Sequence, residues 1–282
     1  MLTTMPDGSV RDVRALLTDI DGTLLGPRHE LTDRSVRAIR RLARAGVTFG
    51  FATGRMPSGT VAIARRLAVP CARVCYSGAY VVDETGAVVL DRTIPGDVAR
   101  DLLAFMGRLW PVLQPCYFTG PHWCVRDPDA PAIRQEAEIV GCEPEQADLF
   151  ALLDRGALPN KVFVSRSMDA GTSLRVAEAL RVRYPMLDVI RSTSGVMIEI
   201  IPRGVDKAAG ARALLAAHGL SCDQLMAFGD DMNDVPLLRA AGWGVAMGNA
   251  AKDVRTLAND VAPSNAEDGF GRYLDGLHPQ AS

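Results

Sequence analysis

Two short apolar runs in this chain each end in a group of acidic residues. Residues 15–17 run into Thr18-Asp19-Ile20-Asp21-Gly22-Thr23, and residues 225–228 run into the segment GDDMND, which includes Asp230. An apolar run bounded by turn residues predicts a buried strand. Open α/β sheets bind their ligands beyond the carboxyl ends of their strands. We therefore expect both acidic groups to follow strands of an α/β sheet.

The residues after the first acidic group predict a helix and then another strand. In residues 31–46, Thr32 can cap a helix, apolar residues recur at helical spacing, and Gly46 can end it. Residues 47–52 form a further apolar run, which is interrupted at Thr53. Strand, helix and strand in this order are typical of a parallel sheet with helices on both faces. The predicted fold class is α/β, with a doubly wound, Rossmann-like core.

The middle of the chain differs in character from both ends. Residues 80–90 predict a hairpin, because two β-rich runs flank a glycine-bearing turn. Helical and β-rich segments then alternate, at residues 97–109, 161–165, 172–183 and 187–191. The parallel pattern resumes at residues 196–201, 206–218, 225–228 and 243–247. We predict a core of residues 1–92 and 195–282, with residues 93–194 inserted as an α+β cap domain.

Composition argues against several classes of function. The chain has 282 residues, a formal net charge of -2 and a pI near 6.1, so no general positive field attracts nucleic acid. No apolar run approaches the roughly 20 residues that a membrane span needs. The six cysteines include no CxxC pair, which argues against a zinc or dithiol redox site and favours buried free thiols. We expect a cytoplasmic protein with neither a nucleic acid nor a membrane partner.

Asp19 and Asp21 are two positions apart at the end of the first apolar run. If the strand continues through them, alternation along an extended backbone points both carboxylates to one side. Two facing carboxylates repel unless a cation or a shared proton relieves them, and this pairing suits a carboxylate nucleophile beside a carboxylic acid. A simpler interpretation is that the aspartates only cap the backbone of a turn.

The second acidic group offers hard oxygen ligands. Asp230, Asp231, Asn233 and Asp234 follow the apolar run directly. Such ligands suit Mg²⁺, which binds few protein carboxylates and leaves room for water and a phosphate oxygen. The alternative is a solvated helix start in which Asn233 is the N-cap residue. The two interpretations are compatible.

Two further places in the sequence are suited to a phosphate group. Thr53, Gly54 and Arg55 offer a hydroxyl, exposed amides and a guanidinium. Lys207 lies near the start of an alanine-rich segment that predicts a helix, where the helix dipole disfavours a cation. A bound anion would explain a lysine at this position. A flexible surface lysine is the other interpretation.

Taken together, the motifs resemble those of the haloacid dehalogenase superfamily of phosphatases. The ordered set is DIDGTL at Asp19, ATGR at Thr53, IEIIPRGVDKAAG with Lys207, GDDMND at Asp230 and AMGNA with Asn249. The insertion between the second and third motifs is similar to that of Cof-type members with a class IIB cap. In one departure, Ser77-Gly78-Ala79 stands where similar sequences have Asn-Gly-Ala.

The resemblance implies a role for each motif. Asp19 would be the nucleophile, and Asp21 the general acid that protonates the leaving oxygen and then activates water. Thr53 and Lys207 would hold the transferring phosphoryl group. Mg²⁺ would be bound by Asp19, Asp21 and Asp230, with Asp21 contributing its backbone carbonyl. The implied substrate-binding set, which Asp234 would support, is Thr53, Gly54, Arg55, Lys207 and Asn233.

The expected activity is magnesium-dependent hydrolysis of a small phosphorylated metabolite, with a sugar phosphate favoured, through an aspartyl-phosphate intermediate. A phosphotransferase or phosphomutase would use the same chemistry with a hydroxyl acceptor in place of water. A third hypothesis is a non-catalytic module that binds a sugar phosphate. Specificity would come from the cap, whose candidate contacts are His122, Trp123, Arg126, Asn160, Lys161 and Arg191. No pattern indicates an oligomeric state.

Overall fold

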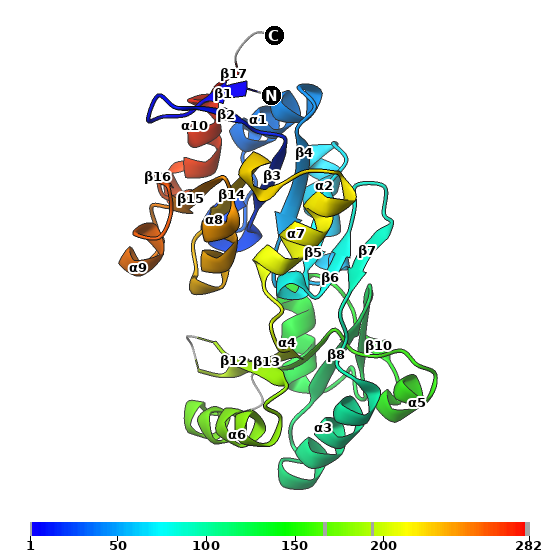
Figure 1. The fold of residues 1–282 in the computed structure, drawn as a ribbon. Coiled ribbons are helices and arrows are strands. Elements are labelled where there is room, and N and C mark those ends of the chain that lie inside the picture. The colour runs from blue at the N-terminus through cyan, green and yellow to red at the C-terminus, as the bar shows by residue number, and fades with distance from the viewer. Residues whose placement is uncertain (1, 166–167, 193–194, 280–282) are drawn as a thin grey trace. The chain divides into compact units, whose positions relative to one another are not determined.

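The computed structural model describes residues 2–165, 168–192 and 195–279, and these form two compact units. The first unit comprises the described parts of Met1–Arg55, Thr60–Leu90 and Asp206–Ser282. The second comprises Met56–Gly59 and the described parts of Asp91–Val205. Most of the second unit is therefore inserted between two segments of the first (Figure 1).

A mainly parallel sheet organises the described part of the first unit. Its strands are β3 (Ala15–Thr18), β4 (Thr48–Ala52), β5 (Ala72–Cys75), β6 (Tyr80–Val82), β7 (Val88–Asp91), β14 (Leu225–Gly229), β15 (Trp243–Met247) and β16 (Asp260–Ala262). Their order across the sheet is β16-β15-β14-β3-β4-β5-β6-β7. Neighbours from β16 to β5 are parallel, and β6 is antiparallel to β5. β6 and β7 are neighbours in the sheet, which agrees with the hairpin predicted for residues 80–90.

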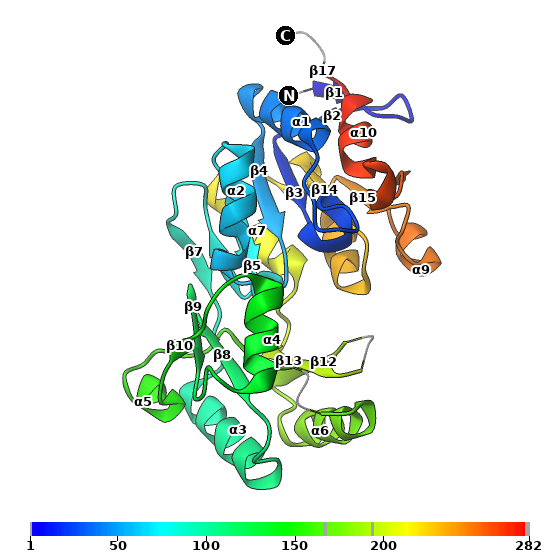
Figure 2. The ribbon, with the colours of Figure 1, turned by 180° about the vertical axis from the view of Figure 1, so that it is seen from behind.

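Helices cover both faces of this sheet (Figures 1 and 2). They are α1 (Asp33–Arg44), α2 (Val61–Leu67), α7 (Lys207–Ala217), α8 (Val235–Ala240), α9 (Lys252–Arg255) and α10 (Gly269–Asp275). One buried cluster joins apolar side chains of α1, α2 and α10 to the sheet, and another joins those of α7 and α8. The predicted doubly wound α/β core is confirmed.

Local sequence signals explain where these elements begin. All four residues of β3 are buried, as its apolar composition predicts. Thr32 is the N-cap residue of α1, and its hydroxyl oxygen accepts a hydrogen bond from the backbone N–H of Ser35 at 3.1 Å. Asp206 caps α7 in the same way, by accepting from the N–H of Ala209. A small antiparallel sheet of β1 (Leu2–Thr4), β2 (Val10–Asp12) and β17 (His278–Pro279) completes the first unit.

The second unit has its own sheet and its own core. Its strands are β8 (Pro115–Thr119), β9 (His122–Val125), β10 (Glu145–Gln146), β11 (Lys161–Ser165), β12 (Leu187–Arg191) and β13 (Met197–Pro202), in the order β10-β9-β8-β11-β13-β12. Its helices are α3 (Gly96–Leu109), α4 (Pro131–Val140), α5 (Leu149–Asp154) and α6 (Ala170–Arg183). Apolar residues of α3, α5 and α6 pack on the sheet in one cluster.

The prediction that residues 196–201 return to the parallel core is wrong. β13 pairs antiparallel with β11 and with β12, and Ile198 and Ile200 are buried in the core of the second unit. An apolar run indicates a strand but not the sheet that the strand joins. The second unit accordingly extends to Val205 rather than to residue 194.

All six cysteines are free thiols, and four of them are buried. None of the helices in the described ranges is long and apolar enough to cross a membrane.

Candidate active site

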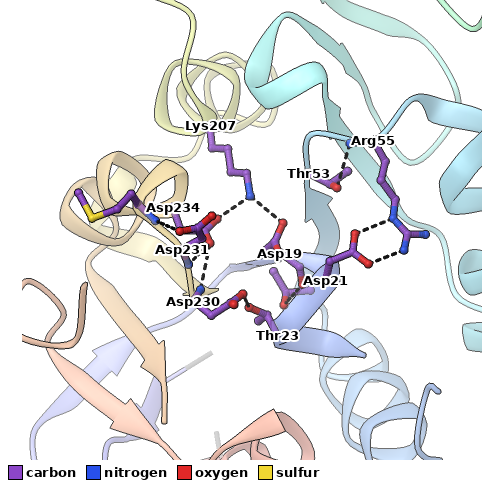
Figure 3. A network of polar contacts seen from close by, with 11 residues as sticks. Asp19, Asp21, Thr23, Thr53, Arg55, Lys207, Asp230, Asp231 and Asp234 are labelled. Atoms are coloured by element: carbon purple, nitrogen blue, oxygen red, sulfur yellow. Dashed lines mark hydrogen bonds and ion pairs between the residues drawn. The ribbon is translucent and has the colours of Figure 1, made fainter. Parts of the chain in front are cut away.

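The sheet brings the two acidic groups together. Asp19 directly follows β3 and Asp230 directly follows β14, and these strands are parallel neighbours. The backbone N–H of Asp19 also donates to the carbonyl of Phe228 at 3.0 Å, which holds the two strand ends side by side. Residues more than 200 positions apart in sequence thus meet at one edge of the sheet (Figure 3).

Lys207 lies between two carboxylates at this edge. Its ammonium nitrogen Nζ is 2.6 Å from Oδ1 of Asp19 and 2.5 Å from Oδ1 of Asp234 (Figure 3). Lys207 is 1% exposed and Asp234 is fully buried. These two carboxylates account for a cation at the start of α7, so the unfavourable position in the helix dipole does not by itself require a bound anion.

Asp234 has a larger part in the site than the sequence suggested. Its second carboxylate oxygen, Oδ2, accepts hydrogen bonds from the backbone N–H groups of Asp230 and Asp231, at 2.9 and 3.0 Å. Asp234 therefore holds the loop after β14 in shape while it pairs with Lys207. In the sequence, only the position of Asp234 indicated this structural role, because it is the last acidic residue before the apolar residues of α8.

Three carboxylates form a group that fits a metal ion. Asp19, Asp230 and Asp234 each offer one oxygen, and these oxygens lie within 4.8 Å of one another. With all three ionised, one ammonium leaves an excess of two negative charges, which a divalent cation would neutralise. Hard oxygen ligands in this number suit Mg²⁺. The residues present therefore fit the magnesium ion expected from the motifs.

Burial and mutual repulsion perturb the acidity of this group. Burial raises the pKa of Asp19 well above its ordinary value, although the Lys207 ammonium opposes the rise. Burial also raises the pKa of Asp230 to about 6, against a hydrogen bond from Thr23. Burial alone would lower the pKa of Lys207, but Asp19 and Asp234 together raise it above its ordinary value. The two carboxylates therefore favour the charged form of Lys207.

Asp21 lies beside this group but has a different partner. It lies beyond the end of β3, in the segment Ile20–Leu24, and its φ of -84° and ψ of 122° are extended rather than helical. Its carboxylate oxygens accept from Nε and Nη2 of Arg55, at 2.7 and 2.5 Å. The Asp21 side chain is therefore outside the three-carboxylate group, and magnesium binding by its backbone carbonyl stays a prediction.

The remaining predicted residues differ in how they are held. Thr53 is 1% exposed at the end of β4, and its hydroxyl oxygen accepts from the backbone N–H of Arg55 at 3.1 Å. Gly54 lies between them in the loop. Asn233 is exposed within the turn Met232–Asp234. The interpretation of Asn233 as the N-cap residue of the following helix is wrong, because Asp234 occupies that position before α8, and Asp231 caps the turn Met232–Asp234.

Two supporting residues around Asp230 were not singled out from the sequence for this role. The hydroxyl of Thr23 donates to Oδ1 of Asp230 at 2.6 Å. The side-chain amide of Asn249 donates to the carbonyl of Gly22 at 2.9 Å and lies 3.4 Å from Oδ2 of Asp230. A Cβ atom at Gly22, whose φ is +81°, would come within 2.3 Å of Asp230. The glycine and threonine after Asp21 therefore let Asp230 approach the first loop.

The candidate cap contacts are held by neighbours within the second unit. Asn160 is fully buried, and its side-chain amide donates to Asp91 and accepts from the N–H of Gly120. Trp123 is 2% exposed and stacks on Phe118. Among the other candidates, His122 contacts Glu145 and Lys161 pairs with Glu199. Arg126 and Arg191 donate to the backbone carbonyls of Leu113 and Ala170. Asn160 and Trp123 therefore contribute to the packing of this unit.

Comparison with known proteins decides the family. The family model described as haloacid dehalogenase-like hydrolase matches residues 16–274. The chain belongs to this family. The resemblance inferred from the motifs is confirmed, and the matched range contains every residue of the candidate site.

Several relatives of this hydrolase have names or structures. It is 26% identical over 274 residues to the pyridoxal phosphate phosphatase YbhA of Escherichia coli, across 93% of this chain and 97% of that protein. It is 28% identical over 238 residues to an HMP-PP phosphatase of Cronobacter sakazakii, across 82% and 83%. A haloacid dehalogenase-like hydrolase from Bacteroides thetaiotaomicron has the same fold, with a TM-score of 0.84, 26% identity, and coverage of 93% and 98%. These relatives support the predicted enzyme class, the phosphoric monoester hydrolases.

Replacement of Lys207 by methionine should destabilise the hydrolase, and more so at about pH 8 than at about pH 5. Methionine fills the space but leaves two buried carboxylates without their cation, which costs about 3–5 kcal/mol for a broken buried pair. In the variant, the folded-state pKa of Asp19 rises further above its unfolded value. A group shifted in this direction contributes stability at low pH that is lost as the pH rises through the folded pKa.

Urea unfolding in EDTA at the two pH values measures this effect. Lys252→Met is the matched control, because Lys252 is exposed on α9, and it should change stability by no more than about 0.5 kcal/mol. An equal loss of stability at both pH values in Lys207→Met would contradict the electrostatic account of the site.

Proposed function

We propose that this hydrolase is a magnesium-dependent phosphatase that cleaves a small phosphorylated metabolite through a covalent intermediate on Asp19. The observation that carries the proposal is the placement of Lys207, whose Nζ is 2.6 Å from Oδ1 of the proposed nucleophile. A buried carboxylate held by a fixed cation, beside a second acidic ligand in Asp230, is suited to phosphoryl transfer. In that reaction, positioning and charge neutralisation supply most of the catalysis.

In the first step, an oxygen of Asp19 forms a bond to phosphorus as the bond from phosphorus to the ester oxygen breaks. Lys207 and the hydroxyl of Thr53 hold the transferring group and offset its charge. Mg²⁺ bound by the acidic group would keep Asp19 ionised and add positive charge near the phosphoryl oxygens. In the second step, water attacks phosphorus, the acyl phosphate bond breaks, and the Asp19 carboxylate and inorganic phosphate are released.

Asp21 is the proposed general acid and base of both steps. It gives a proton to the leaving oxygen in the first step and takes one from water in the second. Both of its carboxylate oxygens accept from Arg55 in the structure. Protonation removes the charge of Asp21 and weakens its hydrogen bonds from Arg55, so we infer that Arg55 partly releases Asp21 when the acid form is needed. Arg55 would then be available to a phosphate oxygen.

The substrate class rests on the relatives. Those named above act, by their names, on pyridoxal phosphate and on HMP-PP. Both names support the proposal that the substrate of this chain is a small phosphorylated metabolite. The preference for a sugar phosphate, the cytoplasmic location and the absence of a nucleic acid or membrane partner stay predictions. A phosphate-release screen across phosphorylated metabolites would identify the substrate.

The second unit is the proposed source of specificity. Its inserted position between the ATGR segment and Lys207 is that of the predicted cap domain, and it carries an independent core. The first unit contains Asp19, Asp230, Asp234 and Lys207, so substitutions in the second unit should alter the choice of substrate rather than the chemistry.

Two alternative functions can be distinguished from that of a phosphatase. A phosphotransferase or phosphomutase would share every step up to the intermediate, and analysis of products with and without a sugar acceptor separates it from a phosphatase. The arrangement of Asp19, Lys207 and Asp230 argues against a non-catalytic binding module, because binding alone does not need a buried carboxylate paired with a buried cation.

The variant Asp19→Asn should lose hydrolysis of phosphate esters. The amide has nearly the shape of the carboxylate but cannot form the acyl phosphate, and we expect turnover to fall by more than about a thousandfold. Phosphate release by the purified variant, with folding checked by circular dichroism, is the measurement. Asp223→Asn, at an exposed position, is the control. Turnover within tenfold of the wild-type value in folded Asp19→Asn would rule out this nucleophile.

The variant Asp21→Asn should have a defect that depends on the leaving group. The nucleophile remains, but an alkoxide cannot leave without a proton, whereas p-nitrophenolate can. We expect the burst of p-nitrophenol in the first turnover to persist while turnover of an alkyl phosphate falls by about 100-fold or more. Rapid-quench kinetics with both substrates tests this. Equal losses with both leaving groups would show that Asp21 does not act as the acid.

A further inference from the structure

A turn with an unusual backbone lies between β5 and β6. Its three residues all have positive φ angles, namely 49° at Tyr76, 55° at Ser77 and 109° at Gly78. Left-handed backbone is unfavourable for residues with a Cβ atom, and the strain is greatest for bulky ones such as tyrosine. Such a conformation persists only where the surrounding structure holds it. The contacts of this turn therefore indicate what it is used for.

On one side, the turn is bonded to the loop that carries Thr53. The N–H of Ser77 donates to the carbonyl of Thr53 at 3.0 Å, and the N–H of Tyr76 donates to the carbonyl of Arg55 at 3.2 Å. The N–H of Thr53 in turn donates to the carbonyl of Val74 at 2.9 Å. The backbone on both sides of the Thr53 side chain is thus fixed to β5 and to the turn.

On its other side, the turn packs against the first turn of α7. A Cβ atom at Gly78 would lie 2.0 Å from the carbonyl oxygen of Asp206, the residue before Lys207. A Cβ atom at Gly210 would lie 2.9 Å from the Cα of Gly78 and 2.4 Å from Cγ1 of Val74. The two backbones therefore meet without any side chain between them.

The geometry points to the turn Tyr76–Gly78 as the positioning element that sets Lys207 against Thr53. These two residues come from different elements of the first unit, and the turn bonds to the backbone of one and touches the helix start of the other. The inference rests on the proposed function, in which both residues hold the transferring phosphoryl group. It also assigns position 77 a backbone role, so that serine can stand where similar sequences have asparagine.

The contact can be disturbed without changing a residue of the catalytic machinery. Gly210→Ala adds one methyl group between α7 and the turn, one helical turn after Lys207. Displacement of a positioned group by about 1 Å can lower a rate by about 100-fold. We expect kcat and kcat/KM of the folded variant to fall together, by about tenfold or more. A variant that is only destabilised would have a lower melting temperature and an unchanged kcat per folded molecule.

Gly107→Ala is the matched control. Gly107 lies within helix α3, and a Cβ atom there would meet nothing within 4 Å. The substitution brings the same gain in helix propensity as Gly210→Ala without a new contact. Its melting temperature should stay the same or rise, and its kcat should stay within twofold of the wild-type value.

A second variant distinguishes an effect of the turn from an effect of side-chain packing against Val74. It also provides a test if Gly210→Ala alone does not fold. Val74→Ala removes the atom nearest to the new methyl group and leaves the contact with the backbone of Gly78. If the turn positions Lys207, kcat of the double variant Val74→Ala/Gly210→Ala stays about tenfold or more below that of Val74→Ala. A kcat within twofold of Val74→Ala would overturn the inference. An inactive wild-type chain would instead refute the proposed function.

Discussion

The ion pairs of Lys207 with Asp19 and Asp234 are the interaction on which the rest of the site depends. All three side chains are removed from water, and burial of charge is unfavourable unless partners and hydrogen bonds compensate it. The compensation comes from the fold. Parallel pairing of β3 with β14 brings Asp19 to the loop that holds Asp234, and α7 begins where its first residue reaches both. One lysine still leaves the acidic group with excess negative charge, which explains why a divalent cation fits there.

The supporting contacts show how a site of flexible side chains can be made rigid. The backbone N–H groups of Asp230 and Asp231 bind one oxygen of Asp234, and Thr23 binds Asp230 from the neighbouring loop. The left-handed turn Tyr76–Gly78 adds backbone contacts to the loop of Thr53 and to the start of α7, and these contacts do not depend on rotamers. Preorganisation of this kind reduces the reorganisation needed when charge develops during phosphoryl transfer.

Much of the fold and site follows from local patterns in the sequence, because apolar runs, helix caps and acidic loops are local signals. The strands beside Asp19 and Asp230 and the cap at Thr32 were predicted correctly for this reason. The sequence did not predict which sheet β13 joins or that Asp21 pairs with Arg55, because each contact involves residues distant in sequence. The presence of Lys207 was recognised as informative, but its protein partners were visible only in three dimensions.

The proposed mechanism depends on Mg²⁺ binding to the acidic group around Lys207 through Asp230. The most direct measurement compares the melting temperatures of the wild-type hydrolase and of Asp230→Asn, each with EDTA and with saturating Mg²⁺. Asparagine keeps an oxygen that can accept from Thr23 but removes one negative charge. A ligand that binds only the folded state raises the melting temperature. The account predicts a clear rise for the wild-type protein and little or none for Asp230→Asn, whereas equal rises, or no rise in either protein, would contradict it.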